Sequence, residues 1–349
     1  MIRRPLMHAL LGTLALSALL ATEALALDPL PQELVQTFES IPADPRPKNI
    51  TRSTHYWISN EYRHDLFQER ISDTGGVYVG VGTDQNYLLA AWSKPEILVL
   101  MDFDHMIPRI HDVYRLIFAK AETPEDFIAW WQKDKKEEVV GLIKEAYEGE
   151  RLKDVLKAFK TAQHVVIRRL KGSKKRYTKR NISIFLTDQA QYDYIRDLYA
   201  KNRVFAVRGD LTGPGTLKAI GAAAEKAGLK VRTLYMSNAE QYFDYKQSFK
   251  ENIGALPFDE KSTALHTLGW SVYGYADGHY HYNWQSGPNF QDWLANSKMK
   301  SLGRMLNART KSKEEGLSFF DLTPQAWKDK IAARRAKRKK KGKKKSAPN

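Results

Sequence analysis

The segment from Val77 to Asp104 constrains the fold of this chain most strongly. It contains an apolar run, a turn with Gly80 and Gly82, a short helical run, and a second apolar run that ends in Asp102 and Asp104. Runs that are apolar at every position are typical of parallel strands, which helices cover on both faces. The segment therefore predicts part of a Rossmann-like unit, with a ligand close to the glycine turn.

The alternation of strands and helices continues along the chain. Further strands are predicted at 182–186, 204–207 and 231–235, and helices near 189–201 and 216–227. This order predicts an α/β fold with a mostly parallel sheet and helices on both faces.

An Asp-Gly pair near the end of the sheet predicts a different connection. Asp277-Gly278 separates 272–276 from 279–284, and such a two-residue turn is the strongest short signal for an antiparallel hairpin. Pairing across it would place one set of aromatic residues on a common face: Tyr273, Tyr275, Tyr280, Tyr282 and Trp284.

The first 26 residues have the pattern of a secretory signal peptide. Arg3 and Arg4 precede a mostly apolar run, and Ala24-Leu25-Ala26 is a small-residue cleavage site. We therefore expect cleavage near Ala26 and export to the periplasm or the cell exterior. No later segment has the apolar length of a membrane span.

The rest of the chain divides by composition. We expect a proline-rich lead-in at 27–53, a Rossmann-like domain at 54–300 with a helical insertion at about 120–165, and a helical extension at 301–333. Residues 334–349 are expected to form a disordered basic tail.

Most of the formal net charge of +16 comes from this tail, because 334–345 carries ten Lys or Arg and no acid. Such a run would bind an anionic polymer, lipid or nucleic acid, or it would only keep the chain in solution.

Cysteine is absent, which excludes disulfides, thiolate metal sites and a cysteine nucleophile. His279 and His281 share a predicted strand face, but no third ligand stands at a recognisable spacing. We therefore expect no metal site. The serine-hydrolase elbow and the phosphate-binding Walker sequence are also missing.

The turn and the following strand supply the candidate cofactor residues. Asp102 stands 20 residues after Gly82, the offset typical of a ribose contact. Asp84 replaces the third glycine of the dinucleotide fingerprint and would repel a pyrophosphate, so a positively charged ligand with a ribose suits the site better. The candidate cofactor-binding residues are Gly80, Gly82, Thr83, Asp84, Asn86, Asp102 and Asp104.

Polar clusters after two later strands add a candidate ligand cleft. The carboxyl ends of parallel strands meet at one sheet edge, where such folds bind ligands. The candidates there are Asp210, Thr212, Ser237, Asn238 and Glu240. The alternative is that these residues only cap helices and loops.

Several runs together resemble a largely uncharacterised bacterial family over roughly residues 56–267. These runs are Trp57–Glu61, Gly75–Asn86, Gly209–Pro214, Tyr235–Tyr242 and Asn252–Asp259. The family is similar in fold to class I S-adenosylmethionine-dependent methyltransferases. The resemblance implies a seven-stranded sheet that ends in an antiparallel hairpin, and S-adenosylmethionine as the cofactor.

Two hypotheses follow. The first is a methyltransferase-like exported protein whose cleft binds S-adenosylmethionine or a related nucleoside. Methyltransferases usually carry an acid where Tyr78 stands and a glycine where Asp84 stands. The second is therefore a non-catalytic exported binding protein that its basic tail attaches to anionic surfaces. The sequence identifies no catalytic residue and no substrate.

Overall fold

The computed structural model describes residues 27–345, with side chains up to residue 338. The predicted signal peptide, 1–26, lies outside the described residues, as do 346–349. Within 27–345, no helix combines the length and the apolar character needed to cross a membrane.

The centre of the molecule is an eight-stranded mixed sheet in the order β3-β2-β1-β4-β5-β6-β8-β7. The strands are β1 (Val77–Val81), β2 (Ile97–Asp102), β3 (Val204–Arg208), β4 (Val231–Tyr235), β5 (Thr263–Leu268), β6 (His281–Ser286), β7 (Thr310–Lys311) and β8 (Leu317–Phe319). The pairs among β1 to β5 are parallel, and β6 runs antiparallel to β5. The predicted α/β fold with a mostly parallel sheet is confirmed.

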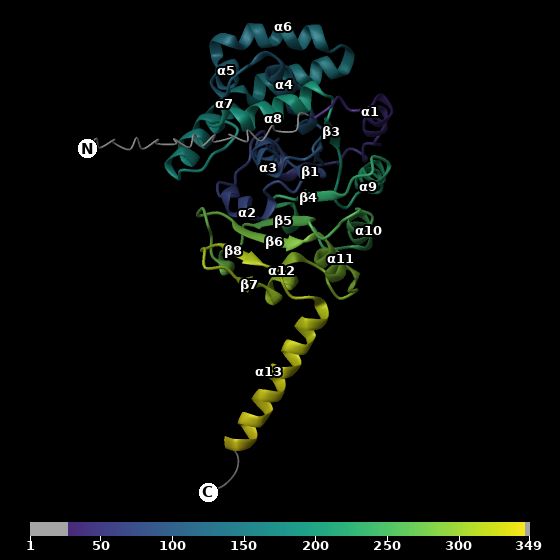
Figure 1. Ribbon diagram of the computed structural model, residues 1–349, viewed down its shortest axis with the longest axis vertical. Helices are drawn as coiled ribbons and strands as arrows, with labels where there is room; N and C mark the ends of the chain where they lie inside the picture. The colour runs from purple at the N-terminus through teal and green to yellow at the C-terminus, as the bar shows by residue number, and fades with distance from the viewer. Residues whose placement is uncertain (1–26, 346–349) are drawn as a thin grey trace, which may run out of the picture.

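Helices cover both faces of the sheet (Figure 1). One face packs on α2 (Gln68–Ile71), α3 (Gln85–Ser93), α4 (Ile107–Lys120), α5 (Pro124–Trp130), α6 (Lys136–Ala146), α7 (Gly149–Lys179) and α8 (Gln189–Ala200). The other packs on α1 (Gln32–Glu39), α9 (Thr216–Lys226), α10 (Gln247–Gly254), α11 (Gly287–Ala295) and α12 (Leu302–Met305). Alternate residues of β1 and β2 enter the two cores, as a fully buried strand requires.

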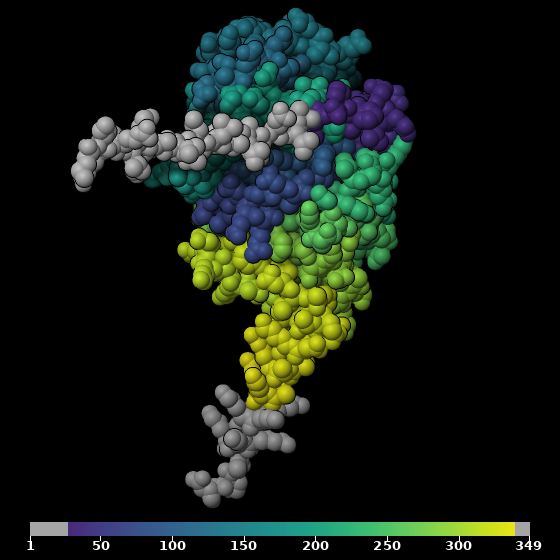
Figure 2. All heavy atoms as spheres, viewed as in Figure 1, coloured from purple at the N-terminus to yellow at the C-terminus, as the bar shows by residue number. Residues whose placement is uncertain are grey.

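The helical insertion is larger than predicted, because α5, α6 and α7 together run from Pro124 to Lys179. Thr123 caps α5 through its side chain, which accepts a hydrogen bond from the N–H of Asp126. These helices lie at one end of the molecule (Figures 1 and 2).

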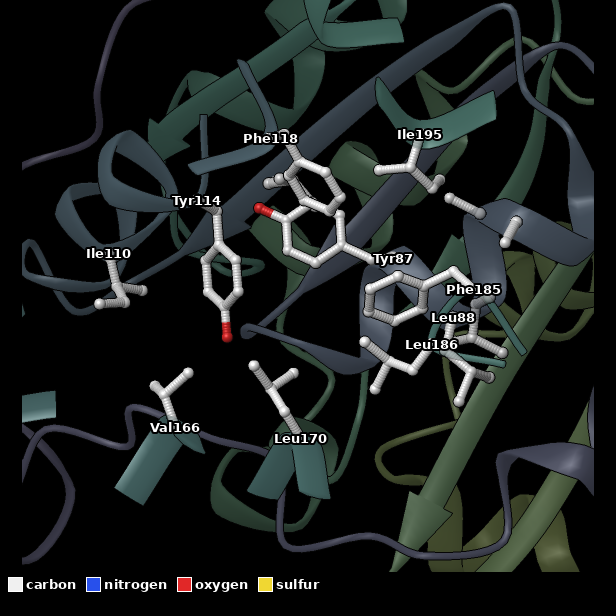
Figure 3. Packing of buried hydrophobic residues seen from close by; sticks show 14 of the residues in the cluster. Tyr87, Leu88, Ile110, Tyr114, Phe118, Val166, Leu170, Phe185, Leu186 and Ile195 are labelled. Atoms are coloured by element: carbon white, nitrogen blue, oxygen red, sulfur yellow. The ribbon is translucent and has the colours of Figure 1, made fainter. Parts of the chain in front are cut away.

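The strand predicted at 182–186 is wrong. Ile184, Phe185 and Leu186 lie in the loop between α7 and α8, and their side chains are buried in the same core as Tyr87 and Leu88. Figure 3 shows Phe185 and Leu186 in this core. A short apolar run shows burial but does not distinguish a strand from a loop that fills the core.

The predicted Asp277-Gly278 hairpin is also wrong. Residues 271–273 form a helical turn, and β6 pairs with β5, which the sequence analysis did not predict. The carboxylate of Asp277 accepts hydrogen bonds from the N–H groups of His279 and Tyr280 and folds the loop on itself. The antiparallel pairing expected at the C-terminal end of the sheet is present, but β5 and β6 form it, and of the predicted aromatic face only Tyr282 and Trp284 lie in this pair.

The C-terminal region differs from the expected arrangement too. Two short strands, β7 and β8, bring the sheet to eight strands, one more than the seven that the resemblance implies. Residues 334–345, expected to be disordered, continue helix α13 (Pro324–Lys345), which projects away from the body (Figure 1). Lys, Arg and Ala are good helix formers, which accounts for the helix.

Candidate functional site

A cavity of about 430 Å³ opens at the carboxyl ends of β1, β2, β3 and β4. Of the residues predicted to form a site, it is lined by Gly82, Thr83, Asp102, Asp104, Asp210, Thr212, Ser237 and Asn238. Its size is that of a pocket for a small organic ligand. The predicted convergence of polar clusters from separate strands is therefore present in this cleft.

The glycine turn is shaped by Gly82, whose φ of +96° favours a residue without a side chain. Its carbonyl accepts a hydrogen bond from Nε2 of His111 at 2.9 Å, and the hydroxyl of Tyr87 lies 2.7 Å from Nδ1. Burial lowers the pKa of His111 to about 4, although the bond to Gly82 opposes that shift. His111 is thus a neutral imidazole that stabilises the glycine turn through its hydrogen bond to the carbonyl of Gly82.

Gly80 does not face the cleft. A Cβ there would lie 2.0 Å from Oδ1 of Asn86. That same oxygen accepts a hydrogen bond from the hydroxyl of Tyr78, and Nδ2 of Asn86 donates to the carbonyl of Val81. Gly80 and Asn86, both predicted to bind the cofactor, instead join α3 to β1.

Asp84 is buried and paired within the protein. Its Oδ2 lies 2.7 Å from Nε of Arg169 on α7, and its Oδ1 accepts a hydrogen bond from the N–H of Ser59. The same guanidinium donates to the carbonyl of Glu61. The carboxylate expected to attract a positive ligand is therefore satisfied by α7, and Asp84 does not line the cleft.

Three carboxyl groups do line it. Asp102 accepts a hydrogen bond from the N–H of Asp104, and Asp104 contacts Nδ1 of His55 at 2.7 Å. Asp210 accepts from both the N–H and the hydroxyl of Thr212. Burial raises the pKa of Asp102 to about 7, and the charges of Asp104 and Asp210 act in the same direction.

Ser237 stands where β4 ends and has a φ of +52°, an uncommon backbone conformation for a residue with a side chain. Its hydroxyl donates to Oε1 of Glu61 at 2.7 Å. Glu61 is fully buried and also accepts from Thr267, Tyr235 and His64. Burial opposes ionisation, yet these hydrogen bonds hold the pKa of Glu61 below its ordinary value. Sequence reasoning missed Glu61 as the group that fixes this wall of the cleft.

Glu240 is buried behind the same loop. One carboxylate oxygen lies 2.5 Å from Nδ1 of His266, and the other accepts from the hydroxyl of Tyr245. Glu240, predicted to line the cleft, instead anchors the loop that carries Ser237 and Asn238 to β5.

Another wall of the cleft comes from the chain before β1, at the boundary between the predicted lead-in (27–53) and the predicted Rossmann-like domain (54–300). The lining residues there are Asn49, Ile50, Thr51, Thr54, Tyr56, Ile58, Ser59 and Asn60. Tyr56 and, on the opposite loop, Tyr242 are 41% and 55% exposed at the cleft. The run Trp57–Glu61 was the only sequence signal for this wall.

Asp44, in the same lead-in, organises the loop that follows β3. Its carboxylate accepts hydrogen bonds from the N–H groups of Asp210, Gly215 and Thr216. It thereby caps the start of α9 from a distant part of the chain. The position of Asp210 in the cleft depends on this contact.

Among the described residues, no cluster of histidine and acidic side chains could hold a metal ion. His281, considered as a ligand, contacts the carbonyl of Gly274 and the hydroxyl of Ser318 instead.

The fold and the cleft define an α/β protein with a ligand-sized, carboxylate-lined pocket at the carboxyl edge of its parallel strands. A family model described as a domain of unknown function, DUF7790, matches residues 56–321. The chain belongs to this family. None of the curated proteins compared with it matches.

Proposed function

We propose that the cleft binds a nucleoside that carries a positive charge and no phosphate, with S-adenosylmethionine as the ligand that fits this description best. The observation that carries the proposal is the convergence of Asp102, Asp104 and Asp210 on one cavity. A ribose would be held by a carboxylate after β2, and the sulfonium charge would balance the remaining acids.

The charge of the walls supports this choice of ligand. None of the described residues that line the cavity is Lys or Arg, the side chains that usually hold phosphates. Tyr56, Phe103, Tyr242 and Phe243 supply apolar and aromatic surface for a planar base.

The strand order supports a Rossmann-like, methyltransferase-like fold. The chain builds β1, β2 and β3 outward in one direction and then returns to place β4 on the other side of β1. Ligands bind at this reversal in open α/β sheets, and Gly82 and Ser237 follow the two strands that flank it.

Methyl transfer from a sulfonium requires mainly that an acceptor is held in line with the methyl group. We assign no catalytic residue, and Ser237, Asn238 and Thr212 are the candidates for the acceptor side of the cleft.

Calorimetric titration of the full chain with three ligands tests the proposal. We expect S-adenosylmethionine to bind more tightly than S-adenosylhomocysteine, which lacks the charge, and ATP not to bind. Asp210→Asn should weaken the binding of S-adenosylmethionine about tenfold, because it removes one favourable charge. The proposal would be contradicted if neither adenosyl ligand gave heat at a concentration of about 1 mM, which is enough to detect even weak binding.

A second candidate is an exported, non-catalytic binding protein attached to anionic surfaces. Helix α13 favours it, because it carries the basic run away from the body (Figure 1). Deletion of 334–349 should then abolish sedimentation with vesicles of anionic lipid at low salt. Equal sedimentation of both chains would exclude this role, and retention on RNA alone would assign the run to nucleic acid.

A further inference from the structure

A second cavity, of about 360 Å³, is lined by His111, the residue that contacts the carbonyl of Gly82 in the glycine turn. Its walls come from the end of α1, from α4, from the start of α7, from α8 and from β3, the edge strand of the sheet. Its charged lining residues are Glu39, Arg109, Asp112, Arg115 and Arg151. Three guanidinium groups thus share one cavity, in contrast to the carboxylate-lined cleft.

Two of the three guanidinium groups share one carboxylate. Asp112 is buried, and its oxygens lie 2.9 Å from Nη1 of Arg109 and 2.7 Å from Nη2 of Arg151. This pairing fixes both guanidinium groups at the cavity wall. Burying a single carboxylate between two arginines leaves a net positive charge at this wall.

Arg115 has no such partner among the described residues. Its Nη2 donates to the carbonyl of Val204 at 2.8 Å, and its guanidinium lies over the ring of Tyr199. These contacts hold the group in place without neutralising it. Glu39 is exposed at the rim, where solvent screens its charge.

We propose that this cavity is a second ligand site, which binds the phosphate or carboxylate group of a small anion. A guanidinium offers two parallel N–H donors to such a group, and Arg is the side chain best suited to hold it. The apolar walls, Phe38, Ile41 and Phe205, would contact the rest of the ligand. The proposal is independent of the ligand assigned to the cleft.

The two cavities are joined by a chain of hydrogen bonds. Tyr199 and His111 line the second cavity, and the hydroxyl of Tyr87 lies 2.7 Å from both the hydroxyl of Tyr199 and Nδ1 of His111. Nε2 of His111 donates to the carbonyl of Gly82 in the cleft. Because His111 then accepts at Nδ1, the donors run in one direction, from Tyr199 through Tyr87 and His111 to Gly82.

Calorimetric titration of the full chain with inorganic phosphate and with citrate tests the site, at constant ionic strength. In Arg115→Gln, binding of at least one of the two anions should weaken about tenfold, as expected for the loss of a charged hydrogen-bond donor. Arg168→Gln is the matched control, because Arg168 is an exposed residue of α7. Phosphate bound by the basic run of α13 is common to all these chains and cancels in the comparison.

A second variant guards against a folding defect in Arg115→Gln. Glu39→Lys replaces an exposed carboxylate at the rim with a cation. It should raise the affinity for the same anion about threefold, which is the usual size of the effect of a surface charge. Equal affinities of Arg115→Gln, Glu39→Lys and the unaltered chain would overturn the proposal. So would the absence of heat with both anions at about 10 mM, beyond the range of specific sites.

Discussion

Asp84 and Arg169 form a buried ion pair, with 2.7 Å between Oδ2 and Nε, across 85 residues of sequence. The pair joins the glycine turn to the middle of α7, the longest helix of the insertion. The helical insertion therefore supports the ligand cleft directly.

Replacement of Arg169 by Met should destabilise the fold by about 3–5 kcal/mol, because it leaves a buried carboxylate without its partner. Asp84→Asn in the same chain should recover part of this loss, since the amide keeps the bond from Ser59 and carries no charge. Urea unfolding of the two single variants and the double variant measures the coupling. Arg168→Met, on the exposed side of α7, is the control and should change stability by less than about 0.5 kcal/mol. Equal losses for Arg169→Met and Arg168→Met would show that the pair contributes nothing.

Gly80→Ala should destabilise by about 1–3 kcal/mol, as overpacking of a core does. The new methyl group would overlap Oδ1 of Asn86, which is fixed by Tyr78. Gly172→Ala is the comparison, because a Cβ at Gly172 in α7 meets nothing within 4 Å. That variant should stabilise by up to about 1 kcal/mol through helix propensity. Thermal unfolding of both variants measures whether the two changes in stability have opposite signs. If Gly80→Ala is as stable as the unaltered chain, the side chain of Asn86 does not pack against Gly80.

Asp102 should make the protein less stable as the pH rises. Its pKa is about 7 in the folded chain, above the ordinary value of 3.8, so the folded state binds the proton more tightly. The stability that this proton supplies is complete below about pH 4 and is lost as the pH rises through about 7. Asp102→Asn mimics the protonated form. Its free energy of unfolding should therefore exceed that of the unaltered chain by roughly 2–4 kcal/mol at pH 8 and match it near pH 4. Chemical unfolding at the two pH values checks this, and a constant difference would contradict the shifted pKa.

His111 should act in the opposite direction. Its pKa of about 4 lies below the ordinary 6.5, so the unfolded chain binds the proton more tightly. Stability from this residue is complete above about pH 6.5 and is lost as the pH falls towards 4, by up to about 3 kcal/mol. His111→Asn should remove that part of the pH dependence. The measurement is the slope of the unfolding free energy between pH 4 and 6.5. It is made in the Asp102→Asn chain with and without His111→Asn, so that the two chains differ only at His111.

The sequence predicted the elements that local patterns determine. The strands at 77–81, 204–207 and 231–235 are confirmed, as are the helices that separate them. Because the ends of parallel strands share one edge, Asp102, Asp210 and Ser237 were correctly expected to meet there.

The parts that failed depend on distant partners. Asp84 looked like a ligand group because Arg169, which neutralises it, lies on a helix far along the chain. Asp277-Gly278 looked like a hairpin turn because nothing nearby indicates that β5 pairs with β6. The wall from Asn49 to Asn60 has no regular pattern, so its place in the cleft follows only from the tertiary fold.

Helix α13 has a consequence for how the two charged parts of the molecule act on each other. Its 22 residues extend for about 33 Å, whereas charges in physiological salt are screened over about 8 Å. The basic run begins ten residues into this helix, about 15 Å from its start, so salt screens it from the acidic cleft. The surface attachment and the ligand binding that we propose would therefore depend on separate groups of charges, and a change in one would leave the other unaltered.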